Sequence, residues 1–181
     1  VRAHLPKLVE RLSALGVDLA ITTNGATLRK LAKPLADAGL KRINISLDTF
    51  DRDRFVELTR RDELAKVLDG IDAAIEAGFD PVKVNCVVMK GINDDEIMDF
   101  VRFGRERGVV VRFIEFMPLD ADQTWSDDQV LSQQGIVDLI SAEYQLEPVQ
   151  RGSSPAARWR YVDGGGEIGV IATVTQAFCD S

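Results

Sequence analysis

The segment that constrains the fold most is residues 42–48, where apolar and polar side chains alternate. Ile43, Ile45 and Leu47 fall on one face of a β-strand, and the polar residues that follow each of them fall on the other. Neighbouring segments predict strand–helix–strand repeats and therefore a parallel sheet, whose strands are usually apolar on both faces. The polar row requires either an edge strand with one face in water or a barrel whose interior holds a polar ligand.

The chain before residue 118 alternates between predicted helices and predicted strands, which is typical of an α/β domain. Glycines follow several of the helices, and Asn93 is expected to be the N-cap of the last one. We expect helices at 8–15, 28–38, 51–58, 64–77 and 94–107, and strands at 18–22, 42–48, 81–89 and 109–117.

The sequence changes character after Pro118. An acidic segment comes first, and a helix at 134–144 and short strands at 145–149, 157–162 and 168–175 are expected beyond it. We therefore expect two regions, a partial β/α barrel at 1–118 and a small α+β region at 119–181.

Composition excludes several classes of function. The net charge of −7 argues against a broad nucleic-acid surface. No apolar run approaches the roughly 20 residues of a membrane span. The chain has two cysteines, Cys86 and Cys179, which form no disulfide framework, so we expect a cytoplasmic protein. The chain lacks a starting Met and ends soon after an apolar stretch, so we expect it to be an internal piece of a longer protein.

Each predicted strand carries polar side chains near its carboxyl end or along one parity, and active sites of β/α barrels lie at the carboxyl ends of strands. These side chains are Thr22 and Asn24; Asn44, Ser46 and Asp48; Lys83 and Asn85; and Arg112, Glu115 and Met117. A buried Lys or Arg is costly unless it meets a counter-charge. Four consecutive strands with such groups favour a polar cavity over one wet edge.

Structural interpretations of these residues remain open. The hydroxyl and amide side chains could satisfy backbone groups at strand ends. Lys83 and Arg112 could form structural ion pairs with Asp48 and Glu115. Cys86 has the parity of its valine neighbours and is expected to be a small core residue.

The order of five motifs resembles one family. Ile21–Gly25 (ITTNG), Arg42–Asp48 (RINISLD), Lys83–Asn85 (KVN), Lys90–Glu96 (KGINDDE) and Arg112–Met117 (RFIEFM) follow one another as in the GTP 3′,8-cyclases. This is the molybdenum cofactor biosynthesis protein A family of radical S-adenosylmethionine (SAM) enzymes. KGIND together with RFIEFM is the specific part of the resemblance, which covers essentially the whole chain.

The resemblance implies a fold, an activity and cofactors. The family fold is a partial (β/α)6 barrel, of which this chain would supply the third to sixth strands. The family uses SAM and two [4Fe–4S] clusters to convert GTP to 3′,8-cyclo-7,8-dihydroguanosine 5′-triphosphate. The downstream partner would be cyclic pyranopterin monophosphate synthase, and a homodimer is left open.

The resemblance also implies site residues. Thr22 and Lys83 would bind GTP, and Ser46, Met117 and Arg112 would bind SAM. Cys179 in the closing Phe-Cys-Asp-Ser would be a ligand of the second cluster.

The CxxxCxxC motif of the first cluster and the other cysteines of the second are not in the 181 residues, so we expect this chain by itself to be inactive. Three other functions remain open: a radical SAM peptide-modifying enzyme with an auxiliary cluster, a Schiff-base aldolase with Lys83 as nucleophile, and a non-catalytic barrel remnant.

Overall fold

The computed structural model describes residues 3–118, 126–150 and 154–175. The chain forms two compact units, Val1–Val84 and Asn85–Ser181, which we describe separately as unit 1 and unit 2. The predicted division between residues 118 and 119 stays a prediction.

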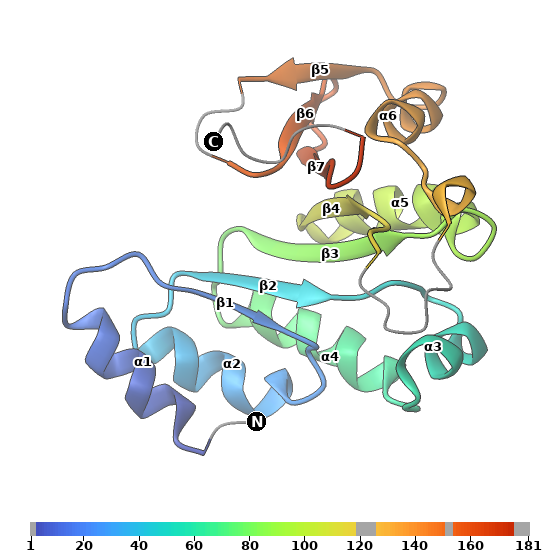
Figure 1. The fold of residues 1–181 in the computed structure, drawn as a ribbon. Coiled ribbons are helices and arrows are strands. Elements are labelled where there is room, and N and C mark those ends of the chain that lie inside the picture. The colour runs from blue at the N-terminus through green and yellow to red at the C-terminus, as the bar shows by residue number, and fades with distance from the viewer. Residues whose placement is uncertain (1–2, 119–125, 151–153, 176–181) are drawn as a thin grey trace. The chain divides into compact units, whose positions relative to one another are not determined.

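Unit 1 alternates between helices and strands as the sequence predicted (Figure 1). Its elements are α1 (Leu5–Ser13), β1 (Ala20–Thr23), α2 (Leu28–Asp37), β2 (Arg42–Ser46), α3 (Arg52–Thr59), α4 (Leu64–Glu76) and the first residues of β3 (Val82–Val88). β1 and β2 are parallel neighbours, and Thr22 stands opposite Asn44. The helices α1, α2 and α4 lie on one side of this pair, whereas α3 lies beyond the end of β2.

The alternation in residues 42–48 sorts the side chains as expected. Ile43 and Ile45 are fully buried and Leu47 is nearly so, whereas Asn44 is half-buried and Ser46 is exposed. The helices bury the apolar face, so the polar face is the one left for a ligand or solvent.

The turn after β1 depends on two glycines. Gly25 has a φ of 77°, a left-handed conformation that a side chain disfavours. Gly70 in α4 passes so close to this turn that an added Cβ would lie 2.3 Å from the Gly25 carbonyl oxygen. The helix can therefore hold the turn against the core, and this fixes the end of the strand that carries Thr22.

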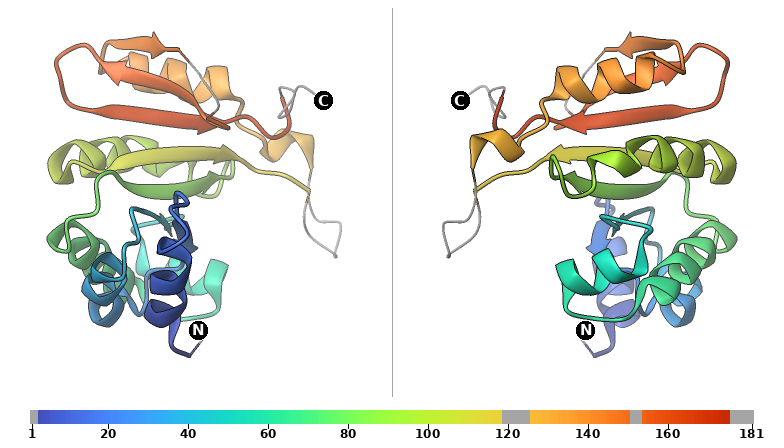
Figure 2. Two further views of the ribbon diagram at one scale, coloured as in Figure 1. Left: turned by 90° about the vertical axis from the view of Figure 1, so that its left-hand side faces the viewer. Right: turned by 90° about the vertical axis from the view of Figure 1, so that its right-hand side faces the viewer.

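Unit 2 is a mixed sheet with helices packed on it (Figure 2). Its elements are the rest of β3, η1 (Asp94–Glu96), α5 (Ile97–Arg107), β4 (Val110–Glu115), η2 (Asp127–Gln129), α6 (Gln133–Ser141), β5 (Leu146–Val149), β6 (Ala157–Tyr161) and β7 (Glu167–Ile171). The strand order is β3-β4-β7-β6-β5. β4 and β7 are parallel, and β6 is antiparallel to both β7 and β5.

The core of unit 2 lies between the sheet and the helices α5 and α6. Phe100 of α5 meets Phe113 of β4 edge to face, with ring centroids 6.3 Å apart. Ile136 and Ile140, one helical turn apart on α6, are fully buried. The apolar face of each helix therefore supplies the burial that stabilises it.

Asn93 stands at the predicted N-cap position, directly before the short turn η1, but its side chain makes no cap. Its side chain reaches back to the end of β3 instead: Nδ2 donates to the Val87 carbonyl at 2.8 Å, and Oδ1 accepts from the N–H of Met89, the residue after the strand, at 2.7 Å. This buried asparagine closes the loop that follows β3.

A second polar cluster joins α5 to the hairpin between β6 and β7. Arg105 donates to both carboxylate oxygens of Asp163, at 3.1 and 2.6 Å. Its Cζ lies 4.4 Å from the ring centroid of Tyr144 and 4.6 Å from that of Tyr161. An added Cβ on Gly165 would lie 2.1 Å from the Arg105 Nη1 atom. The glycine-rich hairpin therefore leaves room for this arginine.

Candidate functional site

Three of the predicted ligand residues lie in unit 1, on the polar face of its strands. Thr22 on β1 is exposed, and Ser46 at the end of β2 is exposed as well. Lys83 on β3 is half-buried, between the buried side chains of Val82 and Val84. The parity of the strands thus places a cation and hydroxyls where a polar ligand can meet them.

Asn44 sets the direction of the Thr22 hydroxyl. The two residues face each other in the parallel register of β1 and β2, and Asn44 Nδ2 donates to Thr22 Oγ1 at 3.2 Å. A threonine hydroxyl has one proton and two acceptor lone pairs. Because Asn44 occupies a lone pair, the Thr22 proton can be donated to an oxygen of a ligand.

An equivalent asparagine contact occurs in unit 2. Arg112 on β4 donates from Nε to Asn85 Oδ1 at 2.8 Å. Both residues are half-buried, and both alternate with core residues along their strands. Because the guanidinium is planar, this bond fixes the orientation of its two terminal nitrogens. Met117 follows β4 and precedes Pro118, and its side chain is half-buried.

Asn44 and Asn85 are functional candidates to which the sequence analysis assigned no role in ligand binding. Their parity was visible in the sequence, where both fall in the polar row. Their partners were not, because the residue opposite Asn44 depends on the register of two strands that are separated by a helix.

The structure describes only one of the two cysteines of the chain. Cys86 is 1% exposed in the core, as predicted. Cys179 lies outside the described residues. Within residues 3–118, 126–150 and 154–175, no group of three or more His, Cys, Asp or Glu side chains is placed to hold a metal ion. The described residues therefore do not fit a [4Fe–4S] cluster.

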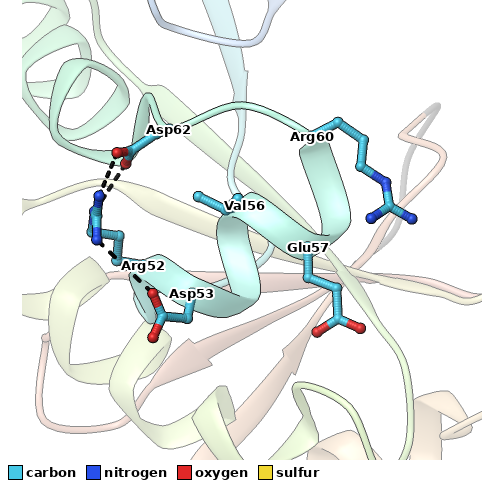
Figure 3. Close-up of a pocket in the computed structure, with 6 residues that line it drawn as sticks. All are labelled: Arg52, Asp53, Val56, Glu57, Arg60 and Asp62. Atoms are coloured by element: carbon cyan, nitrogen blue, oxygen red, sulfur yellow. Dashed lines mark hydrogen bonds and ion pairs between the residues drawn. The ribbon is translucent and has the colours of Figure 1, made fainter.

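A hollow of about 610 Å³ lies beside α3, and none of the predicted ligand residues lines it. Figure 3 shows Arg52 between two acidic side chains in its wall: Arg52 pairs with Asp62 at 2.5 Å and with Asp53 at 3.9 Å. The hydrogen bond from Arg52 holds the pKa of the Asp62 carboxyl below its ordinary value. Five of the six lining residues are exposed, and Arg52 already pairs with two of the acidic side chains, so we assign no ligand to this hollow.

The protein family follows from comparison with known proteins. The family model of the Radical SAM superfamily matches residues 1–104. The chain belongs to the radical SAM superfamily. A second model, Molybdenum Cofactor Synthesis C, matches residues 109–181 of this radical SAM chain. Membership of the superfamily implies SAM and a [4Fe–4S] cluster, although the cluster has no site among the described residues.

Curated relatives align with nearly all of the radical SAM chain. GTP 3′,8-cyclase of Streptomyces coelicolor is 45% identical over 187 residues, which cover 100% of this chain and 54% of the relative. GTP 3′,8-cyclase of Rhodopirellula baltica is 44% identical over 180 residues, which cover 97% of this chain and 50% of the relative. The chain thus spans about half the length of the curated relatives it matches.

Solved structures confirm the predicted fold class, an α/β fold with a partial radical SAM barrel. Streptococcus suis SuiB matches with a TM-score of 0.60 and 16% identity, covering 75% of this chain and 32% of that one. The structure of TYW1 with a lysine-pyruvate adduct matches with a TM-score of 0.59 and 15% identity, covering 82% and 48%. At these identities the likeness concerns the fold alone. Among the described residues of the radical SAM chain, no helix has the length and apolar character needed to span a bilayer.

Proposed function

We propose that this chain is part of a GTP 3′,8-cyclase, which converts GTP to 3′,8-cyclo-7,8-dihydroguanosine 5′-triphosphate in molybdenum cofactor biosynthesis. One observation carries the proposal. Relatives with this name are 41% to 45% identical to the chain over nearly its whole length, across both regions matched by the family models. The product would pass to cyclic pyranopterin monophosphate synthase.

Thr22 and Lys83 are the proposed GTP ligands. The ammonium of Lys83 is a compact positive charge, suited to a triphosphate in a protein whose net charge is −7. The Thr22 hydroxyl accepts from Asn44 and can donate its proton to a ribose or phosphate oxygen.

Ser46, Arg112 and Met117 are the proposed SAM ligands, and their chemistry fits that molecule. SAM carries a carboxylate, an amino group and an adenine with both donors and acceptors. Arg112, oriented by Asn85, suits an anionic group. Ser46 offers an exposed hydroxyl, and the Met117 carbonyl can accept from an amino group because the following proline keeps this backbone extended.

When bound in the full-length protein, SAM and a [4Fe–4S] cluster would supply the radical chemistry at C3′ of GTP. The residues of this chain would hold SAM and GTP in a fixed geometry, which is how proteins reduce the entropic barrier of such a step. In the proposed full-length enzyme two clusters are expected, with Cys179 as a ligand of the second.

Anaerobic assay of the full-length protein tests the proposal. After iron–sulfur reconstitution, dithionite, SAM and GTP should give 5′-deoxyadenosine together with the 3′,8-cyclised nucleotide. GTP deuterated at C3′ should transfer deuterium to 5′-deoxyadenosine. The 181-residue chain alone, treated in the same way, should give neither product. If the full-length protein forms 5′-deoxyadenosine without consuming GTP, the proposed substrate is wrong.

A further inference from the structure

Glu115, the last residue of β4, is a carboxylate surrounded by hydrogen-bond donors. It is completely buried, on the opposite face of the strand from Arg112. Oε1 accepts from the Gln133 N–H at 2.8 Å and from the Thr175 hydroxyl at 2.5 Å. Oε2 accepts from the N–H groups of Val174 and Thr175, at 3.0 and 2.9 Å. A structural ion pair with Arg112 is therefore not the role of this side chain.

An ionised carboxylate suits these surroundings and an amide does not. Three of the four donors are backbone N–H groups, which cannot turn away or act as acceptors. One belongs to Gln133, the first residue of α6, where a helix favours negative charge. Burial raises the pKa of Glu115, but the hydrogen bonds from Thr175, Val174 and Gln133 outweigh it and hold the pKa below its ordinary value. The group is therefore charged near neutral pH.

The contacts of Glu115 join three segments that are distant in the sequence. They connect the end of β4, the first turn of α6 and residues 173–175 after β7. The main chain is held too, because the Thr173 hydroxyl donates to the Glu115 carbonyl at 2.9 Å. Met117 lies two residues further on, and Pro118 restricts its backbone. The chain that leads from Glu115 to Met117 therefore starts from a residue whose side chain and main chain are both held by hydrogen bonds.

We propose that Glu115 is a positioning residue for SAM, acting through the backbone of Met117. The contact of Met117 with SAM rests on the proposed function, whereas the network around Glu115 does not. Its hydrogen bonds all go to unit 2, and the proposed GTP ligands Thr22 and Lys83 lie in unit 1. Loss of the network should therefore weaken SAM binding and spare GTP binding.

Glu115→Gln in the full-length, anaerobically reconstituted protein is the main test. The side-chain NH2 group of the new glutamine is a donor, so it could not accept hydrogen bonds from the backbone N–H groups that it would face. We expect the dissociation constant of SAM to rise by about threefold to thirtyfold, as for other residues that act through a neighbour, with GTP affinity unchanged. Hydrogen exchange at the Gln133, Val174 and Thr175 amides should accelerate. Glu147→Gln, on the exposed side of β5, is the matched control and should alter none of these.

Two milder variants keep the proposal testable if Glu115→Gln does not fold. Thr175→Val removes one donor to the carboxylate and should weaken SAM binding, while Thr175→Ser keeps the hydroxyl and should restore it. Faster amide exchange with unchanged SAM affinity would make Glu115 purely structural and overturn the proposal. An equal loss of SAM and GTP affinity would also overturn it. If the wild-type protein does not bind SAM, the proposed function fails first and the positioning role fails with it.

Discussion

Arg105→Ala should be one of the most destabilising substitutions of a partly exposed residue in unit 2. The side chain is 21% exposed and its partner Asp163 is 55% exposed, so the ion pair contributes about 0.2–1 kcal/mol. Contacts with the rings of Tyr144 and Tyr161 contribute roughly 0.5–1 kcal/mol each. We therefore expect a loss of roughly 1–3 kcal/mol in the free energy of unfolding.

Urea unfolding with and without the arginine measures this loss. The midpoint should fall with little change in the slope, since the exposed area on unfolding is nearly the same. Arg105→Lys should recover only part of the stability, because an ammonium has neither the bidentate fork nor the flat surface that contacts the rings. Arg102→Ala is the control on the same helix: its ion pairs are 3.7 and 3.8 Å long and the side chain is 45% exposed, so we expect less than about 0.5 kcal/mol.

Gly165 provides a cross-check by a double-mutant cycle. Gly165→Ala should destabilise the wild type because the methyl group would displace the guanidinium, and it should cost much less when Arg105 is already alanine. Additive effects, or equal losses for Arg102→Ala and Arg105→Ala, would refute the view that this cluster holds the hairpin to α5.

Three further predictions concern polar groups. Asn93→Ala should lower the free energy of unfolding by roughly 2–4 kcal/mol, since two buried backbone groups lose their partner. The stability of Asn93→Asp should lie between those of the wild type and Asn93→Ala. Chemical denaturation measures both variants, and a loss below about 0.5 kcal/mol in Asn93→Ala would contradict the two contacts. Asn44→Ala should weaken GTP binding about threefold to thirtyfold through Thr22, as calorimetric titration of the full-length protein would detect, while an unchanged affinity would exclude the role. The pKa of Glu115 in the folded state lies below its ordinary 4.5, so the native state binds fewer protons than the unfolded state. The contribution of Glu115 to the stability of the fold is therefore present above that pH and is lost as the pH falls through the folded-state pKa. Thermal unfolding across pH 3–6 should show this pH dependence in the wild type and not in Glu115→Gln.

Strand parity was the most reliable information in the sequence. The alternation at residues 42–48 predicted which side chains of β2 are buried, and the valines flanking Lys83 and Asn85 did the same for β3. Burial of one face needs only a period of two, which a single sequence shows directly. Glycines after helices located most helix ends for the same local reason.

Contacts between distant segments were beyond the sequence. Glu115 was grouped with Arg112 in the polar row, yet it has the parity of Val111 and Phe113 and points into the core. A buried carboxylate there makes sense only with donors brought by α6 and by residues 173–175. Asn93 shows the same limit, because a good N-cap residue found better partners at the end of β3.

The affinity of Lys83→Ala for GTP and for SAM tests the central claim most directly. In the reconstituted full-length protein, loss of a charged hydrogen bond to the triphosphate should weaken GTP binding by roughly 1.5–3 kcal/mol, about 10- to 150-fold, and leave SAM binding unchanged. The affinity for guanosine, which lacks phosphates, should fall far less, and Lys30→Ala at an exposed position of α2 should change neither affinity. Unchanged GTP affinity in Lys83→Ala would contradict the assignment of this strand face to the nucleotide.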